Sequence, residues 1–387
     1  MKIILLGING SIGKTTLKVL SNFKNNWEIV GFSIGNDASN VDYLIKTYKP
    51  KAVSFKNEKD YFLYKNLYKD VLFFYGEESY LKLLDNIEYD ILINALSGFS
   101  GFKPSINCLK QNKILLLANK ESLVAGGEII NDILKTNGKL IPIDSEHVAI
   151  KKCLENEDIK NVKNIIITAS GGPFFELDKD EFKNITKEKA LNHPTRKMGQ
   201  RITIDSSTMM NKCFELIEAY YLFNIDFSKI KVLVDRRSLI HGLVIFNDGR
   251  IKECKYTPTM ENPIKYALDK AFNNELDLSD VYLVDKIDSN LLEMNYDKFP
   301  LINLSSLVIE KKGNSGAILN AIDEEAVKAF LNDKIKYIDI YKYICKIMYN
   351  CRYKKNVTIN ELIVSDRQAR KAINYLIEKE SKWKLIY

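Results

Sequence analysis

Short apolar runs alternate with helix-like stretches over the first 150 residues of the chain. Six runs are predicted to be strands: Ile3–Leu6, Ile29–Ile34, Val71–Tyr75, Asp90–Ala95, Ile114–Ala118 and Leu140–Ile143. Short buried strands separated by helices are typical of a parallel sheet with right-handed crossovers. The pattern therefore predicts a doubly wound, nucleotide-binding α/β domain over residues 1–150.

The pattern of apolar positions changes after residue 150. Four further runs are predicted to be strands: Ile165–Thr168, Lys231–Val234, Leu239–Phe246 and Ile251–Tyr256. The last two flank Asn247-Asp248-Gly249, which is a hairpin-turn signal. We expect an α+β domain over residues 151–300. Within it, the stretch 191–201 is rich in Pro, Gly and polar residues, so we expect a functional loop there.

The end of the chain has helical periodicity only. Helices are predicted over Ala317–Leu331, Ile338–Met348 and Ile359–Lys379. We therefore expect a C-terminal helical bundle over residues 301–387. The predicted fold class is α/β, with a Rossmann-like domain, a central α+β domain and this bundle.

Composition narrows the class of protein. The 387 residues carry a formal net charge of +7, and the lysines are scattered along the chain, so we expect no nucleic-acid partner. No apolar run approaches the ~20 residues that span a bilayer, and the apolar start is too short for a signal peptide. Six cysteines form no C-x-x-C pair, so we expect buried free thiols. We expect a cytoplasmic protein without a membrane partner.

A glycine-rich segment, Gly7-Ile8-Asn9-Gly10-Ser11-Ile12-Gly13, follows the first predicted strand. Glycines permit a tight turn and a close approach of the backbone to a pyrophosphate, which the N-terminus of the next helix favours. The segment indicates a dinucleotide site. The alternative is the P-loop of an NTPase, ending at Lys14, but that motif requires Gly at the position of Ile8.

Acidic side chains follow the predicted strand Leu140–Ile143. If Asp144 and Glu146 are extended, their spacing directs both carboxylates the same way, and such oxygen ligands suit Mg²⁺ or Mn²⁺. The alternative is a helix N-cap, in which Ser145 or Asp144 caps and Glu146 complements the helix dipole. Both interpretations remain open.

Two more polar segments are candidates for phosphate binding. Ser170-Gly171-Gly172 follows a strand, and such a turn exposes a hydroxyl and backbone N–H groups, unless it is a plain tight turn. A helix predicted over Ser206–Phe223 places Asn211, Lys212 and Glu215 on one face. That face either bears a solvated Lys–Glu pair, or holds a phosphate and leaves Glu215 as a third metal ligand.

The chain has only three histidines. We expect structural roles for His147, beside the capping segment, and for His241, within a strand. His193 precedes a proline in the predicted functional loop, so it is the functional candidate.

Taken together, these segments resemble the 1-deoxy-D-xylulose 5-phosphate reductoisomerase family. The resemblance is carried by the strings GINGSIG, ANKESLVAGG, PIDSEH, ASGGPF, HPTRKMG, IDSSTMMNKCFELIEA and LNAIDEEAVKAFL. They follow the family order across nearly the whole chain, and their combination is highly specific.

The resemblance implies an oxidoreductase and isomerase of non-mevalonate isoprenoid synthesis. Such an enzyme rearranges 1-deoxy-D-xylulose 5-phosphate by a retroaldol–aldol sequence to an aldehyde. The aldehyde is then reduced with NADPH to 2-C-methyl-D-erythritol 4-phosphate. The resemblance also implies a homodimer, a flap at residues 191–201, and Mg²⁺ or Mn²⁺, with Co²⁺ as a further option.

The resemblance also implies roles for individual residues. The metal ligands are Asp144, Glu146 and Glu215. The catalytic residues are Lys120, Glu146 and His193. The substrate-binding residues are Ser145, Ser170, His193, Ser206, Asn211, Lys212 and Glu215. The cofactor-binding residues are Gly7, Asn9, Gly10, Ser11, Ile12, Gly35, Asn119, Glu121 and Gly199.

Three departures from the family pattern keep alternatives open. Arg196 replaces a flap tryptophan, and Asp235-Arg236-Arg237-Ser238 replaces His-Pro-Gln-Ser. Asn36 and Asp37 stand where a basic residue often serves the 2′-phosphate, and Asp37 would suit the 2′-hydroxyl of NADH. The alternatives are another metal-assisted NAD(P)-dependent reductase of a phosphorylated carbonyl compound, and a non-catalytic nucleotide-binding relative.

Overall fold

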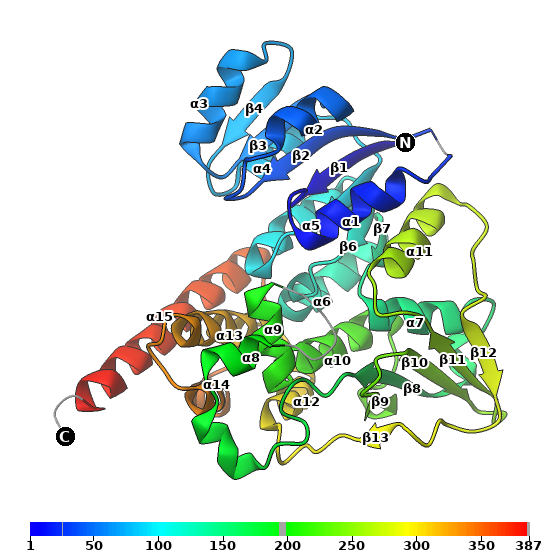
Figure 1. Cartoon of the computed structure of the whole chain (residues 1–387), viewed down its shortest axis with the longest axis vertical. Helices are drawn as coiled ribbons and strands as arrows, with labels where there is room; N and C mark the ends of the chain where they lie inside the picture. Colours follow the sequence, from blue (N-terminus) through cyan, green and yellow to red (C-terminus); the bar gives the residue numbers. More distant parts are fainter. Residues whose placement is uncertain (25, 193–198, 385–387) are drawn as a thin grey trace. The chain divides into compact units, whose positions relative to one another are not determined.

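A seven-stranded sheet organises the first part of the chain (Figure 1). The strand order is β4-β3-β2-β1-β5-β6-β7, and every neighbouring pair is parallel. The bounds are β1 Lys2–Leu6, β2 Glu28–Ile34, β3 Ala52–Phe55, β4 Leu72–Tyr75, β5 Ile91–Asn94, β6 Ile114–Leu117 and β7 Lys139–Pro142. Six of these strands confirm the predicted runs. The seventh, β3, was not recognised, because the polar Ser54 interrupts its apolar run.

The structure is a computed structural model that describes residues 1–24, 26–192 and 199–384. The chain divides into two compact units, which are described separately. Unit 1 comprises Met1–Ser122, Ile130–Val148 and Thr259–Asp277. Unit 2 comprises Leu123–Ile129, Ala149–Pro258 and Leu278–Tyr387.

Helices cover the parallel sheet of unit 1. Their bounds are α1 Ser11–Leu20, α2 Val41–Tyr48, α3 Glu58–Leu67, α4 Ser79–Asn86, the 3-10 helix η1 Gly98–Gly101 and α5 Phe102–Lys110. Two helices carry residues of both units: α6 Glu121–Leu134 and α7 Ser145–Cys153. The connections place helices between successive parallel strands, as the predicted doubly wound fold requires.

A helix from much later in the chain completes the core of unit 1. Helix α11, Glu261–Phe272, buries Ile264 and Leu268 in the same apolar cluster as Val19 of α1 and Ile3 of β1. Phe23 and Phe272 contact each other beside this cluster, with ring centroids 5.6 Å apart. The alternation of strands and helices near the N-terminus gave no indication of this contribution.

A six-stranded sheet organises unit 2. Its order is β12-β11-β10-β8-β9-β13, and β8 and β9 are the parallel pair. The bounds are β8 Val162–Ala169, β9 Ile230–Val234, β10 Ile240–Phe246, β11 Ile251–Lys255, β12 Val281–Val284 and β13 Leu292–Glu293. The predicted hairpin is confirmed, because β10 and β11 pair antiparallel and Gly249 between them has φ +89°. The edge strands β12 and β13 were not predicted.

The rest of unit 2 is mostly helical. The α-helices are α8 Lys187–Leu191, α9 Gln200–Thr208, α10 Met210–Phe223, α12 Leu304–Lys311, α13 Ser315–Leu331, α14 Tyr337–Asn350 and α15 Ile359–Lys384. The 3-10 helices are η2 Ile159–Asn161, η3 Lys179–Asn184, η4 Phe227–Lys229 and η5 Pro300–Asn303. The three predicted C-terminal helices are confirmed by α13, α14 and α15.

The predicted helix over Ser206–Phe223 is wrong in one respect, because the helix is interrupted. Helix α9 ends at Thr208, Met209 has the left-handed φ of 63°, and α10 begins at Met210. The hydroxyl of Ser207 donates to the carbonyl of Ile204 at 2.7 Å, and the hydroxyl of Thr208 accepts from the N–H of Met210 at 3.4 Å. Such bonds compete with the regular helical pattern, so the Ser-Ser-Thr run ends the helix.

The expectation of buried free thiols is confirmed for four of the six cysteines. The six cysteines are free; four are buried and Cys345 and Cys351 are half-buried. Burial raises the pKa of the Cys108 thiol to about 12, so this thiol is inert at neutral pH. Among the described residues, no helix is both long and apolar enough to cross a bilayer.

An aromatic cluster forms part of the interior of unit 2. Phe182 is 1% exposed, and its ring centroid lies 5.8 Å from that of Phe299 and 6.0 Å from that of Tyr337. Edge-to-face and tilted aromatic contacts add to the free energy of area burial.

We predict that Phe182→Ala lowers the free energy of unfolding by ~3–5 kcal/mol, because it leaves a cavity in a packed interior. The midpoint of urea denaturation, followed by circular dichroism, measures the change. Tyr375→Ala is the matched control, because Tyr375 is 67% exposed and such surface changes stay within about 0.5 kcal/mol. Equal midpoints for the two variants would contradict the prediction.

Candidate functional site

The glycine-rich turn joins β1 to α1 in unit 1. Gly7 has φ +78°, and a Cβ there would lie 2.6 Å from the carbonyl oxygen of Ala95. A Cβ at Gly13 would lie 2.4 Å from the carbonyl oxygen of Ile8. Helix α1 has no acidic residue in its first turn, so its N-terminus favours an anion. The side chain of Ile8, which stands where a P-loop requires glycine, is fully buried in this turn.

The strand order places this turn at the switch point of the sheet. Strand β1 lies between β2 and β5, and the order reverses there. In doubly wound folds, ligands bind at the carboxyl ends of the strands at this point. Hydrogen bonds join the turn to its surroundings: the N–H of Gly7 donates to Ser33 Oγ at 2.8 Å, the N–H of Ile8 to the carbonyl of Ser33 at 3.4 Å, and Asn9 Nδ2 to the carbonyl of Asp37 at 2.7 Å.

Asp37 lies in the loop after β2, beside the predicted cofactor residue Gly35. Its carboxylate accepts from the N–H of Ser39 at 3.0 Å, and hydrogen bonds with Ser39 lower the pKa of Asp37 below its ordinary value. The carboxylate therefore stabilises its own loop. A Cβ at Gly35 would meet no atom within 4 Å, so the backbone is open to a ligand there.

Asn119 and Glu121 connect the loops after β5 and β6. Asn119 Nδ2 donates to the carbonyl oxygens of Leu96 and Gly98, each at 2.9 Å, and Glu121 accepts from the N–H of Gly98 at 3.2 Å. Both side chains thereby maintain the loop at the switch point. Their predicted contacts with a cofactor remain predictions.

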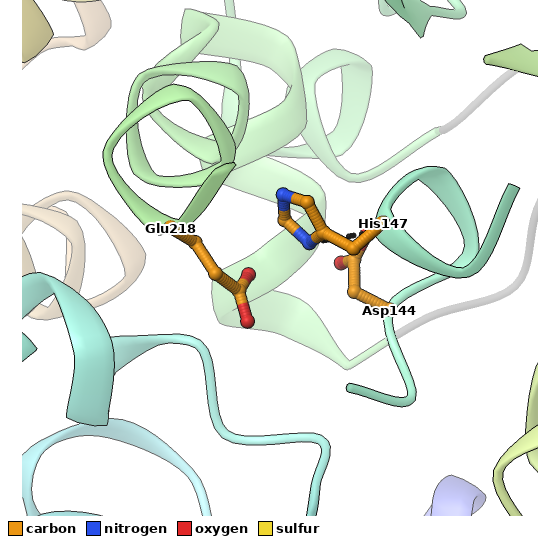
Figure 2. A group of neighbouring side chains, drawn as sticks. All are labelled: Asp144, His147 and Glu218. Carbon is orange, nitrogen blue, oxygen red and sulfur yellow. Dashed lines mark ion pairs between the residues drawn. The ribbon is translucent and has the colours of Figure 1, made fainter. Parts of the chain in front are cut away.

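Lys120, Asp144 and their neighbours form a buried polar cluster in unit 1. Lys120 Nζ donates to Asp144 Oδ2 at 2.6 Å, and the two side chains are only 9% and 11% exposed. The other oxygen, Oδ1, accepts from the N–H of Glu146 at 3.1 Å and lies 3.5 Å from His147 Nδ1 (Figure 2). Ser145 Oγ donates to Glu146 Oε2 at 2.5 Å.

These contacts bear on the two interpretations of Asp144, a helix N-cap or a metal ligand. Asp144 precedes α7 and accepts from a first-turn N–H, so it does act as the N-cap. Carboxylate oxygens of Asp144 and Glu146 nevertheless lie within 4.8 Å of each other. Buried carboxylates are costly unless cations or hydrogen-bond donors face them, and hard oxygen donors suit Mg²⁺ or Mn²⁺. Capping and metal binding are therefore compatible here.

In unit 2, the Ser170–Gly172 turn lies against the end of α9. Gly171 and Gly172 have φ +79° and +64°, and the N–H of Gly172 donates to Ser170 Oγ at 3.2 Å. A Cβ at Gly172 would lie 2.8 Å from the carbonyl oxygen of Ser206. The structure thus brings together two predicted phosphate-binding residues, Ser170 and Ser206.

Helix α10 adds Asn211, Lys212 and Glu215 to unit 2. Lys212 Nζ donates to Glu215 and to the carbonyl of Thr168 at the end of β8. Asn211 Nδ2 donates to Glu215 Oε1 at 2.6 Å. Lys212 and Glu215 are 4% and 1% exposed, so the alternative of a solvated surface pair is wrong.

Glu218, one turn beyond Glu215, was missed by the sequence analysis. Its side chain is 1% exposed and extends from α10 (Figure 2). A signal was present in the sequence, because Glu218 follows Glu215 by three residues within an apolar stretch. The buried His147, for which a structural role was expected, faces the carboxylate of Asp144.

The remaining predicted residues lie in or near the loop 191–201. His193 and Arg196 lie outside the described residues. Gly199 is extended and precedes α9, where its carbonyl accepts from the N–H of Thr203 at 3.1 Å. His241 stacks on Tyr256 with centroids 4.0 Å apart, as a structural role requires.

Comparisons of this chain with known proteins find matches to one family of enzymes. Three family models match: "1-deoxy-D-xylulose 5-phosphate reductoisomerase" over residues 3–127, its "C-terminal domain" over 140–223, and "DXP reductoisomerase C-terminal domain" over 257–372. The 1-deoxy-D-xylulose 5-phosphate reductoisomerase of Caldanaerobacter subterraneus subsp. tengcongensis is 38% identical over 96% of this chain and 98% of its own. The protein of that name from Chloroherpeton thalassium is also 38% identical, over 96% and 97%.

Solved structures agree with the sequence relatives. A crystal structure of DOX-P reductoisomerase with NADPH, fosmidomycin and magnesium has a TM-score of 0.87, at 29% identity and 98% coverage of both chains. The 1-deoxy-D-xylulose 5-phosphate reductoisomerase of Zymomonas mobilis in complex with NADPH has a TM-score of 0.86, at 30% identity. It covers 97% of this chain and 99% of its own.

We predict that Gly13→Ala abolishes tight dinucleotide binding, because its Cβ would overlap the backbone of the glycine-rich turn. The dissociation constant for NADPH, measured by fluorescence titration, is expected to rise by at least ~10-fold, or about 1.4 kcal/mol. Lys18→Ala is the control, because Lys18 is an exposed residue of the same helix. Unchanged affinity in folded Gly13→Ala protein would refute the prediction.

Proposed function

The chain belongs to the 1-deoxy-D-xylulose 5-phosphate reductoisomerase family, and we propose on this basis how its residues carry out the reaction. The protein converts 1-deoxy-D-xylulose 5-phosphate into 2-C-methyl-D-erythritol 4-phosphate with NADPH and a divalent metal. One observation carries this conclusion: two enzymes of that name are each 38% identical to this chain over 96% of its length.

NADPH fits the turn between β1 and α1. The residues proposed to hold it are Gly7, Asn9, Gly10, Ser11, Ile12, Gly35, Asn119, Glu121 and Gly199. The tight backbone contacts of Gly7 and Gly13 leave N–H groups at a helix N-terminus for the pyrophosphate. When bound, NADPH supplies the hydride. Asp37 Oδ1 accepts from the N–H of Ser39, so one oxygen of this carboxylate stabilises the loop.

A divalent metal, Mg²⁺ or Mn²⁺ with Co²⁺ as a further option, is proposed to bind Asp144, Glu146 and Glu215. All three are buried or nearly buried carboxylates, and Asp144 is already fixed by Lys120 and by capping. When bound, the metal polarises the ketone and hydroxyl oxygens of the substrate. Rigid ligands reduce the reorganisation that metal binding requires.

The substrate is proposed to bind through two groups of residues. Ser145 and Lys120 would contact its hydroxyl and carbonyl oxygens, and the Lys120 ammonium would stabilise negative charge there. Ser170, Ser206, Asn211 and Lys212 would bind the phosphate through hydroxyl, amide and ammonium donors. Catalytic roles are proposed for Lys120 and Glu146, and also for His193, which lies outside the described residues.

The proposal also covers the domain boundaries, the localisation and the oligomeric state of the protein. We propose functional domains at 1–150, 151–300 with its flap at 191–201, and 301–387, in a cytoplasmic enzyme. A homodimer is supported by the family and by edge strand β12, where Tyr282 and Leu283 are 47% and 67% exposed.

Sedimentation velocity is expected to give the mass of two chains, and the mass of one chain at micromolar concentration would contradict the proposed homodimer.

The proposed function predicts NADPH oxidation that depends on both substrate and metal. Purified protein with Mn²⁺ and 1-deoxy-D-xylulose 5-phosphate should lose NADPH absorbance at 340 nm (a property of the reduced nicotinamide), and EDTA should stop the reaction. Glu215→Gln should lower kcat/KM by at least ~100-fold, about 2.7 kcal/mol, while NADPH affinity stays unchanged.

Glu310→Gln is the control for this carboxylate change, because Glu310 is exposed in the same unit. Turnover of other phosphorylated carbonyl compounds instead would favour a different reductase. Tight NADPH binding without turnover, at any divalent metal, would favour a non-catalytic relative.

A further inference from the structure

The turn that carries Ser170 has a neighbour at the same edge of the unit 2 sheet. Strands β8 and β9 are parallel, and Ala169 pairs with Val234. The N–H of Asp235 donates to the carbonyl of Ala169 at 2.9 Å, so the pairing extends to the ends of both strands. The Ser170–Gly172 turn and the segment 235–238 therefore begin side by side.

Asp235 gives this neighbouring segment a defined shape. Its carboxylate, 1% exposed, accepts from Arg237 N and Nε at 3.1 and 2.9 Å, and from the N–H groups of Leu239 and Ile240 at 3.1 and 2.9 Å. Burial opposes ionisation, but these hydrogen bonds outweigh it and lower the pKa of Asp235. Asp235 is thus a carboxylate that fixes the backbone immediately after Arg236.

Arg236 extends from this fixed segment to the Ser170–Gly172 turn. Its guanidinium donates to the carbonyl oxygens of Ser170 and Gly172, the latter at 2.8 Å. It also lies over the ring of Phe175, 5.7 Å from the centroid. A Cβ at Gly171 would lie 3.0 Å from the same guanidinium nitrogen. One side chain therefore bridges both ends of the turn and fills the space beside its middle residue.

The turn needs such a bridge because two consecutive left-handed glycines form it. Glycine loses more conformational entropy on ordering than any other residue, so a Gly-Gly turn is intrinsically loose. Ser170 Oγ is held by the N–H of Gly172, so any motion of Gly172 also moves the hydroxyl. The orientation of that hydroxyl depends on how firmly both carbonyls are held.

We infer that Arg236 is a positioning residue that holds the Ser170–Gly172 turn in its phosphate-binding shape. The inference rests on the proposed function, in which Ser170 binds the phosphate of the substrate. Arg236 acts through backbone carbonyls rather than by contacting the substrate. Both bonds come from one nitrogen, Nη1, whose two hydrogens are fixed in the plane of the guanidinium, whereas a lysine ammonium rotates on a flexible stem.

Arg236→Met tests the inference, because it keeps much of the stem and removes the donors. We expect the KM for 1-deoxy-D-xylulose 5-phosphate to rise ~10-fold while kcat stays within about threefold, since ground-state phosphate binding is what weakens. The dissociation constant for NADPH should not change. Arg236→Lys should restore only part of the loss.

Arg250→Met is the matched control, because Arg250 also lies beside an aromatic ring and pairs with acids, but at the β10–β11 turn. Thermal unfolding of all three variants checks that they fold. An unchanged KM in folded Arg236→Met, or full recovery in Arg236→Lys, would overturn the inference.

Binding of inorganic phosphate, measured by calorimetry on wild type and Arg236→Met, separates this inference from the proposed function. Weaker phosphate binding in the variant supports the positioning role even without turnover. Equal phosphate binding overturns the role, whether or not the enzyme turns over its substrate.

Discussion

The candidate site depends on pairs of oppositely charged side chains that are buried away from water. In unit 1, Lys120 faces Asp144; in unit 2, Lys212 faces Glu215, and all four side chains are at most 11% exposed. Removing one partner of such a pair leaves an uncompensated charge, which costs several kcal/mol. A protein selected for stability alone has less costly ways to fill an interior, because apolar residues of similar volume are often neutral or stabilising. The proposed function accounts for these buried charges with ligands: a divalent cation for the carboxylates and a phosphate for the lysine and hydroxyls.

Much of the fold could be predicted because buried strands leave a continuous apolar run in the sequence. Six strands of the parallel sheet and the hairpin turn at Gly249 were found in this way. Features that depend on tertiary contacts were not found. Strand β3 is interrupted by the polar Ser54, and α11 joins the core of unit 1 from a position more than 200 residues beyond β1. The break at Met209 depends on hydroxyl hydrogen bonds that periodicity does not reveal.

Some features of the candidate site could likewise be predicted from the sequence, and others could not. Sequence motifs identified the residue types, but not their burial, and burial is what excludes the solvated Lys–Glu pair on α10. At Asp144, two interpretations that appeared exclusive are compatible, because one carboxylate oxygen caps α7 while the other accepts from Lys120. Glu218 was missed although it follows Glu215 by three residues, and the position of His147 beside Asp144 was missed because a lone imidazole carries no pattern of its own. The departure at 235–238 was visible in the sequence, whereas its structural meaning came only from the parallel pairing of β8 and β9.

The contribution of α11 to unit 1 has a consequence for anyone who wishes to isolate the nucleotide-binding half. A gene fragment ending near residue 150 would encode every strand of the parallel sheet but none of Ile264, Ala267, Leu268 and Ala271. The apolar surface that those side chains cover, around Val19 and Leu20, would face water and invite self-association. The two halves of this polypeptide are consequently interleaved in the gene, and excision requires a circular permutation or a graft of the missing helix.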